Sequence, residues 1–74
     1  MQSYEYGYLH CGLGEQGLNF MKPDGSYDVI TEMYGTMQLA PTMTRLANEG
    51  WEVITSSASD LDGGSMYVIM RRPL

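Results

Sequence analysis

The sequence has few of the residues that usually hold small domains together. It contains one cysteine, Cys11, and one histidine, His10, among 74 residues. One cysteine excludes an intrachain disulfide, and two candidate ligands are too few for a structural zinc site, which usually takes four. A chain of this length forms one domain with a small core, so we expect residues 1–74 to gain stability by forming a homo-oligomer.

Basic residues are also scarce. Four Lys and Arg residues stand against nine Asp and Glu residues, and the net charge is −5. This balance argues against binding to nucleic acid polymers, which need a basic patch, and against anionic membrane surfaces. No apolar run approaches the ~18 residues of a membrane span. Residues 1–5 lack the basic and apolar regions of a signal peptide, so we expect a cytoplasmic protein.

Tyrosine alternates with other residues near the start of the chain. Residues 3–11 are predicted to form a strand in which Tyr4, Tyr6 and Tyr8 share one face. The opposite face then carries the residues between them, which are Glu5, Gly7, Leu9 and Cys11. A glycine in mid-strand indicates a bulge or a close approach of another part of the chain.

Turn residues divide the rest of the chain. Residues 17–22 and 26–32 flank Pro23-Asp24-Gly25, a sequence typical of a hairpin turn. Residues 34–36 are predicted to be a connector and residues 41–49 a helix, with Pro41 in its first turn and Gly50 as its cap. A start near Met37 would place Pro41 inside the helix, so the later start is preferred.

Two further strands are predicted at residues 51–56 and 66–71, separated by a polar turn over residues 57–65. The predicted order is therefore β, β-hairpin, α, β, β. One amphipathic helix packed on one face of a small antiparallel sheet buries both apolar surfaces, so the expected class is α+β. Trp51 is expected to belong to the core, because its ring carries a large apolar area.

Three short segments, Tyr4-Glu5-Tyr6, Glu49-Gly50-Trp51-Glu52-Val53 and Arg72-Pro73, occur in a recognisable order. They resemble a family of short bacterial and phage proteins of unknown function. Members open with a Tyr-Glu-Tyr strand, carry a Leu-rich helix ending in Glu-Gly-Trp-Glu, and close with a strand ending in Arg-Pro. The resemblance covers residues 3–8 and 43–73 and implies a small α+β fold. It supplies no catalytic residues.

Candidate catalytic and metal-binding groups are weakly supported. Adjacent strand residues point to opposite faces, so His10 and Cys11 diverge and do not form a nucleophile–base pair. Asp60 and Asp62 have some likeness to a calcium loop, but its fixed spacing and bidentate Glu are missing. We therefore expect no metal, no cofactor and no enzymatic activity.

Other acidic and glycine-rich segments have ordinary interpretations. The pairs Asp24/Asp28 and Glu49/Glu52 are most simply solvated surface carboxylates. Residues 12–17 match Gly-x-Gly-x-x-Gly by letter, but a hairpin rather than a βαβ unit is predicted after them. A dinucleotide-binding domain is thus excluded, whereas a loop that closes over a ligand stays open.

Tyrosines and arginines are the candidate ligand-binding residues. The stripe of Tyr4, Tyr6 and Tyr8 suits an oligomer interface, and it also suits base stacking. Arg71 and Arg72 point to opposite faces of a regular strand, and one of them near Arg45 could hold a phosphate or carboxylate. Pairing with Glu49 or Glu52 is the alternative.

These features predict a non-enzymatic oligomeric binding module. The resemblance to phage proteins implies a sharper version, in which the module sequesters a small nucleotide signal: arginines would meet its phosphate and tyrosines would stack on its base. A structural or regulatory subunit that docks on a partner protein is the alternative. An enzyme with a site shared between subunits is a third, less favoured hypothesis.

Overall fold

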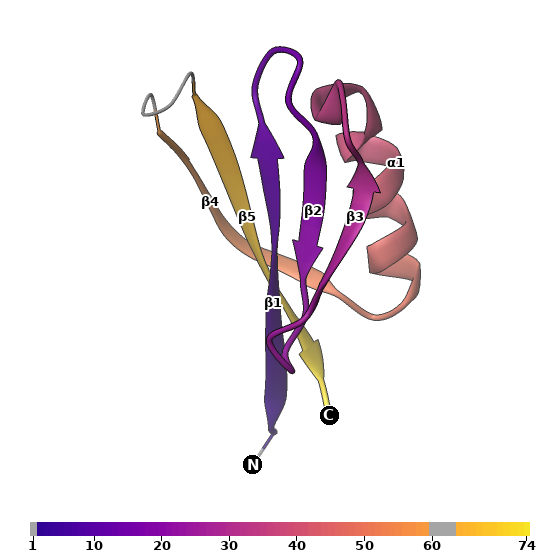
Figure 1. The fold of residues 1–74 in the computed structure, drawn as a ribbon. Coiled ribbons are helices and arrows are strands. Elements are labelled where there is room, and N and C mark those ends of the chain that lie inside the picture. Colours follow the sequence, from indigo (N-terminus) through magenta and orange to yellow (C-terminus); the bar gives the residue numbers. More distant parts are fainter. Residues whose placement is uncertain (1, 60–63) are drawn as a thin grey trace.

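The computed structural model describes residues 2–59 and 64–74, which form one helix and a five-stranded sheet (Figure 1). The strand order is β3-β2-β1-β5-β4, and every neighbouring pair is antiparallel. This arrangement confirms the predicted α+β class and element order. The elements are β1 (Tyr4–Gly12), β2 (Leu18–Met21), β3 (Tyr27–Thr31), α1 (Gly35–Asn48), β4 (Glu52–Ser59) and β5 (Ser65–Pro73).

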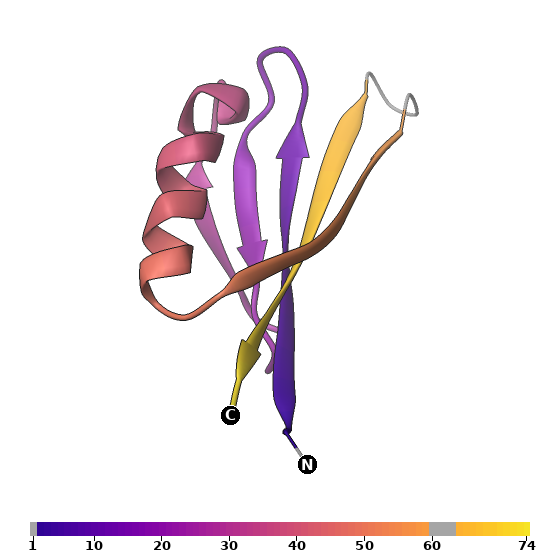
Figure 2. The ribbon, with the colours of Figure 1, turned by 180° about the vertical axis from the view of Figure 1, so that it is seen from behind.

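The molecule has two layers, because α1 covers one face of the sheet. The helix contacts β1, β2 and β3. Seen from behind, it lies in front of β3 and beside β2 (Figure 2). No helix formed by residues 2–59 and 64–74 covers the opposite face of the sheet. No helix among the described residues is long and apolar enough to cross a membrane.

The core lies between α1 and the covered face of the sheet. Leu9 and Cys11 of β1 are fully buried there, as the alternation of residues 3–11 predicted. Trp51 is also buried, as expected, and its ring meets Phe20 edge to face at 5.3 Å between centroids. The remaining buried apolar residues are Leu18, Leu46, Val68 and Met70.

Gly7 is a close-approach glycine rather than a bulge. Strand β1 pairs with β5 without any shift of register around it. A Cβ atom at Gly7 would lie 2.8 Å from the Met21 carbonyl oxygen and 2.9 Å from the Phe20 ring. The absent side chain therefore makes room for the Phe20 ring on the covered face.

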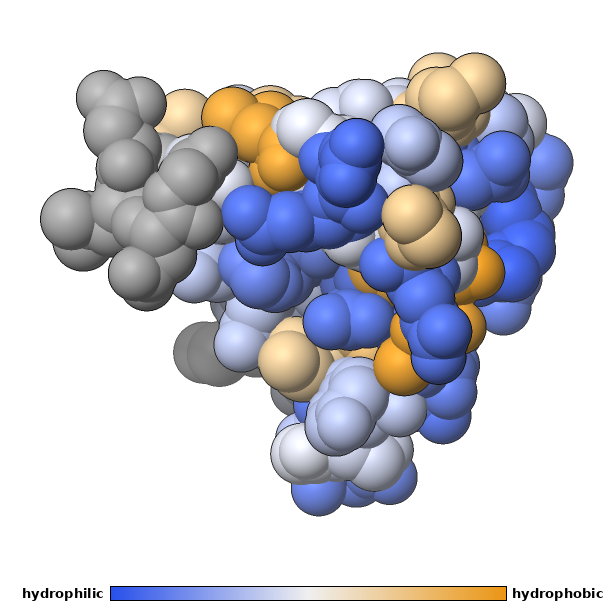
Figure 3. Space-filling view, turned by 45° about the horizontal axis from the view of Figure 1, so that its top comes forward, coloured by the Kyte–Doolittle hydropathy of each residue, from blue (hydrophilic) through white to orange (hydrophobic). Residues whose placement is uncertain are grey.

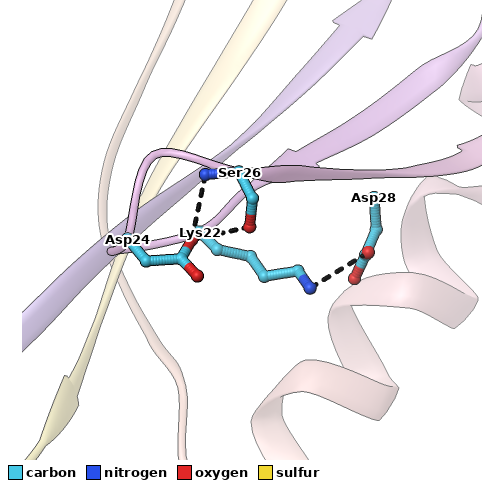
Figure 4. Close-up of polar contacts among 4 residues, drawn as sticks. All are labelled: Lys22, Asp24, Ser26 and Asp28. Carbon is cyan, nitrogen blue, oxygen red and sulfur yellow. Dashed lines mark hydrogen bonds and ion pairs between the residues drawn. The ribbon is translucent and has the colours of Figure 1, made fainter.

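The β2–β3 hairpin forms around the predicted turn. The Lys22 amide donates to the Ser26 carbonyl at 2.8 Å, and Gly25 has φ +90°. The Asp24 carboxylate accepts hydrogen bonds from the amide and hydroxyl of Ser26 (Figure 4). These two bonds, the hydroxyl one first, hold the pKa of Asp24 below its ordinary value.

The predicted helix start was wrong. Helix α1 begins at Gly35, six residues before Pro41, so this proline lies inside it. The supposed connector over residues 34–36 holds the N-cap, Tyr34, and the first two residues of the helix. Contacts distant in sequence fix the start, because the Gly35 amide donates to the Gln16 carbonyl at 2.7 Å. A Cβ atom at Gly35 would lie 2.5 Å from the Gly17 carbonyl oxygen, so only glycine fits. Pro41 is exposed, so solvent can satisfy the carbonyl that its missing N–H leaves free.

The helix end agrees with the prediction. Gly50 has φ +98°, and its amide donates to the Ala47 carbonyl while the Trp51 amide donates to the Leu46 carbonyl, both at 3.0 Å. This pair of bonds is the Schellman arrangement of a helix C-terminus. It turns the chain directly into β4 and carries Trp51 under the end of the helix.

The last two strands are longer than predicted. Strand β4 runs on to Ser59 and β5 begins at Ser65, so residues 57–59 and 65 of the supposed polar turn are paired sheet. The register of β4 shifts between Val53 and Thr55, which places Ile54 in a bulge. The acidic residues of the considered calcium loop, Asp60 and Asp62, lie outside the described residues.

Candidate functional site

The sheet face that α1 leaves uncovered, here called the open face, collects most of the aromatic side chains. Its centre is the tyrosine stripe of β1, the middle strand of the sheet. The register of the neighbouring strands places further rings and apolar side chains on the same face. Its residues include Tyr4, Tyr6, Tyr8, His10, Asn19, Met21, Tyr27, Val29, Glu52, Thr55, Ser57, Tyr67, Ile69 and Arg71.

The rings of the open face contact one another across strands. Tyr67 lies 5.9 Å from Tyr8 and 4.9 Å from His10, measured between ring centroids. The Arg71 guanidinium lies 4.2 Å above the Tyr4 ring. Such cross-strand pairs order the side chains before any partner arrives, which lowers the entropy cost of binding.

Several open-face side chains are half exposed in a single chain. Tyr6 exposes 54% of its area, Tyr27 58% and Val29 52%. Tyr6 also lines an apolar hollow of about 220 Å³, whose walls include Tyr8, Met21 and Ile69. In a view with the top of the molecule tilted forward, strongly hydrophobic residues form separate spots among hydrophilic ones (Figure 3). Tyrosine rings thus supply apolar area without a continuous aliphatic patch.

The open face is nearly neutral. Its cation is Arg71, whose Nε donates to the Glu52 carboxylate at 2.5 Å. This hydrogen bond raises the pKa of Arg71, so the guanidinium stays charged and paired. One balanced ion pair on this face contrasts with the net charge of −5 for the whole chain.

The structure divides the six predicted ligand-binding residues between two sides of the sheet. Tyr4, Tyr6, Tyr8 and Arg71 lie on the open face, and the stripe shares that face as the alternation predicted. Arg45 and Arg72 lie on the other side, where they line one pocket. Within one chain the tyrosines and these two arginines therefore do not form a single site.

The predicted surface pairs are also present. Arg45 Nε lies 3.6 Å from a Glu49 oxygen, and Arg71 pairs with Glu52 as described above. Asp28 pairs with Lys22 at 3.1 Å. The carboxylates considered as acid–base pairs thus each have a separate partner rather than facing one another.

The candidate nucleophile is buried. Cys11 is fully buried in the core, and burial raises the pKa of its thiol. His10 lies on the open face beside Tyr67, so the two side chains diverge as predicted. In the part of the chain that the structure describes, no three His, Cys, Asp or Glu side chains are grouped to hold a metal ion.

No family model, curated protein or solved structure matches this chain at a significant level. The resemblance to the family of short bacterial and phage proteins is therefore carried only by the three segments quoted above.

Proposed function

We propose that this protein is a non-enzymatic binding module that acts as a homodimer, with two open faces packed against each other. The observation that carries the proposal is the uncovered aromatic face of the sheet. Half-exposed Tyr6, Tyr27 and Val29 lie on this face, and Tyr6 also lines its apolar hollow. Tyrosine is enriched in protein interfaces because one ring offers apolar area and a polar end.

The size of the open face suits a reversible dimer. Five strands about 4.8 Å apart, with about seven residues each at about 3.3 Å per residue, outline a face of about 500 Å² in plan. Stable interfaces bury about 800 Å² of accessible surface per partner, and a rough surface exceeds its plan area. We therefore expect a dissociation constant of about 1 µM or weaker, near 8 kcal/mol of association free energy.

The charge distribution favours a dimer formed through the open face over a dimer formed through another surface. Two chains of net charge −5 repel each other wherever their carboxylates come close. The open face carries Arg71 and Glu52 already paired, so little uncompensated charge is buried when two such faces meet.

The alternative of a regulatory subunit uses the same surface. A partner protein would then cover the open face in place of a second copy. Nucleotide sequestration at this face would instead need a base stacked on the tyrosines and a phosphate near Arg71. The regulatory-subunit alternative predicts a monomer in the absence of its partner, so the oligomeric state separates it from the dimer.

The test is the mass of the purified protein by light scattering or sedimentation, over about 1 to 200 µM protein, a range that spans the expected dissociation constant. We expect twice the 8.3 kDa of one chain at the upper end and dissociation on dilution. Tyr6→Glu places a charge at the centre of the face and should leave a monomer throughout. Gln38→Glu adds the same charge on an exposed helix position and should dimerise like the wild type.

Two results would overturn the proposal. One is a wild-type monomer at every concentration. The other is equal weakening of the dimer by Tyr6→Glu and Gln38→Glu, which would indicate a general charge effect or another interface. Circular dichroism of both variants checks that the sheet and helix still form.

A further inference from the structure

A second surface feature lies on the helix side of the sheet. A pocket of about 420 Å³ opens between the C-terminal half of α1, the β2–β3 hairpin and the end of β5. Pockets that bind small molecules usually measure about 300–1,000 Å³. This pocket on the helix side shares Lys22 and Pro23 of the hairpin with the hollow of the open face, whereas its other lining residues, Arg45 among them, belong to the pocket alone.

Basic side chains are concentrated at this pocket. Lys22, Arg45 and Arg72 are three of the four Lys and Arg residues of the chain, and all three line it. The carboxylates that line it are Asp28 and Glu49. The remainder of the sequence carries one cation and seven carboxylates. Glu5, which pairs with Arg72, adds a third carboxylate, so the three cations are balanced one to one and the pocket is neutral on a chain of net charge −5. It therefore repels small anions less than the rest of the surface does.

The three cations come from separate elements and are held at the rim. Lys22 lies 3.1 Å from Asp28 across the hairpin (Figure 4), and Arg45 lies 3.6 Å from Glu49 along the helix. The Nε atom of Arg72 donates to Glu5 at 3.0 Å. Its guanidinium also lies 4.6 Å above the Trp51 ring, which fixes the plane of the group.

The ion pair between Arg45 and Glu49 is weak enough for a ligand to compete. Arg45 and Glu49 are both more than half exposed, and exposed pairs of this kind contribute little to stability. The pair uses Nε of Arg45, which leaves the Nη groups able to donate to a ligand. Arginine binds phosphate through two parallel charge-assisted hydrogen bonds, which are stronger than a loose pair in water.

The walls of the pocket indicate that the ligand has an organic part. Phe20, Leu46 and Trp51 form its apolar side, and the volume exceeds what an inorganic phosphate fills. We propose that this pocket binds a small phosphate monoester, with the phosphate between Arg45, Lys22 and Arg72 and the organic part against the apolar wall. Asp28 and Glu49 then accept hydrogen bonds from hydroxyl groups of the ligand.

The test uses the fluorescence of Trp51, the only tryptophan of the chain and part of the pocket wall. The probes are ribose 5-phosphate, phenyl phosphate and inorganic phosphate, titrated separately at one ionic strength. We expect a saturable change with both esters, with dissociation constants below about 1 mM and about tenfold weaker binding of inorganic phosphate.

Arg45→Gln and Arg71→Gln form a matched pair of variants. Both remove one guanidinium, but Arg45 lines the pocket and Arg71 lies on the open face. We expect Arg45→Gln to weaken ester binding about tenfold or more and Arg71→Gln to leave it unchanged. Both variants should keep the circular dichroism spectrum of the wild type, because the substituted side chains are surface residues.

Three results would overturn the proposal. They are no saturable change with either ester, inorganic phosphate binding as tightly as the esters, and equal weakening by the two substitutions. The dimer proposal is tested separately, because Arg45→Gln changes no residue of the open face. A monomer that still binds the esters would overturn the dimer and retain the pocket.

Discussion

The two faces of the sheet use the same five strands but different kinds of side chain. The covered face presents Leu9, Cys11, Phe20, Val68 and Met70, all 5% exposed or less. The open face presents mainly tyrosine, with His10, one ion pair and a few aliphatic side chains, and Tyr6, Tyr27 and Val29 remain half exposed. Aliphatic and sulfur side chains gain most from burial, whereas tyrosine tolerates both water and a protein partner. The covered face therefore holds the fold together, and the open face stays available for binding.

Strand β1 offers the strongest way to test this division, because its alternate residues belong to opposite faces. Leu9→Ala removes a fully buried side chain and should lower the free energy of unfolding by about 2–5 kcal/mol. Tyr6→Ala removes a half-exposed ring and should cost the monomer about 0.2–1 kcal/mol. Urea denaturation followed by circular dichroism, at a concentration below the dimer range, measures both. Similar losses in the two variants would contradict the division.

The next largest loss of stability is expected at Gly7, a position on the covered face of the sheet. Gly7→Ala places a methyl group within 3 Å of Met21 and Phe20 and should cost about 1–3 kcal/mol. Gly25→Ala is the matched control, since its Cβ meets open space and only the positive φ opposes it. We expect the control to lower the free energy of unfolding by about 1 kcal/mol. A larger loss of stability in Gly25→Ala than in Gly7→Ala would contradict this expectation, because backbone strain would then cost more than the packing clash.

Cys11 gives a smaller, pH-dependent effect. Burial raises the pKa of its thiol, so the folded chain keeps the proton at a pH where the unfolded thiol, with a pKa near 8.5, loses it. The stability that this difference contributes is present below about pH 8.5 and is lost as pH rises through the folded pKa. The urea midpoint of unfolding should therefore fall more between neutral and alkaline pH for the wild type than for Cys11→Ala. Equal falls would contradict this role of burial.

The fold was largely predictable because its main signals are local. The period-two alternation of Tyr4, Tyr6 and Tyr8 placed the faces of β1, and the Pro23-Asp24-Gly25 turn placed the hairpin. The helix start was not predictable from local signals. Pro41 is a good first-turn residue, and the hydrogen bond that moves the start to Gly35 comes from Gln16, nineteen residues earlier in the chain.

The candidate sites were predictable only in part for the same reason. The opposite directions of Arg71 and Arg72 follow from strand alternation, and the Arg45–Glu49 pair follows from helical spacing. Lys22 was missed, because it reaches the pocket only when the hairpin packs beside the end of α1. The uncovered state of the tyrosine face also depends on which side of the sheet the helix takes.

The most direct test of the two-face account is a dilution series followed by NMR of side-chain signals. The account predicts concentration-dependent shifts at Tyr6, Tyr27 and Val29 on the open face and none at Leu46 or Val68 in the core. Shifts that are absent throughout, or that gather along the β4 edge or the helix surface, would contradict the open face as the surface through which this protein binds a second copy.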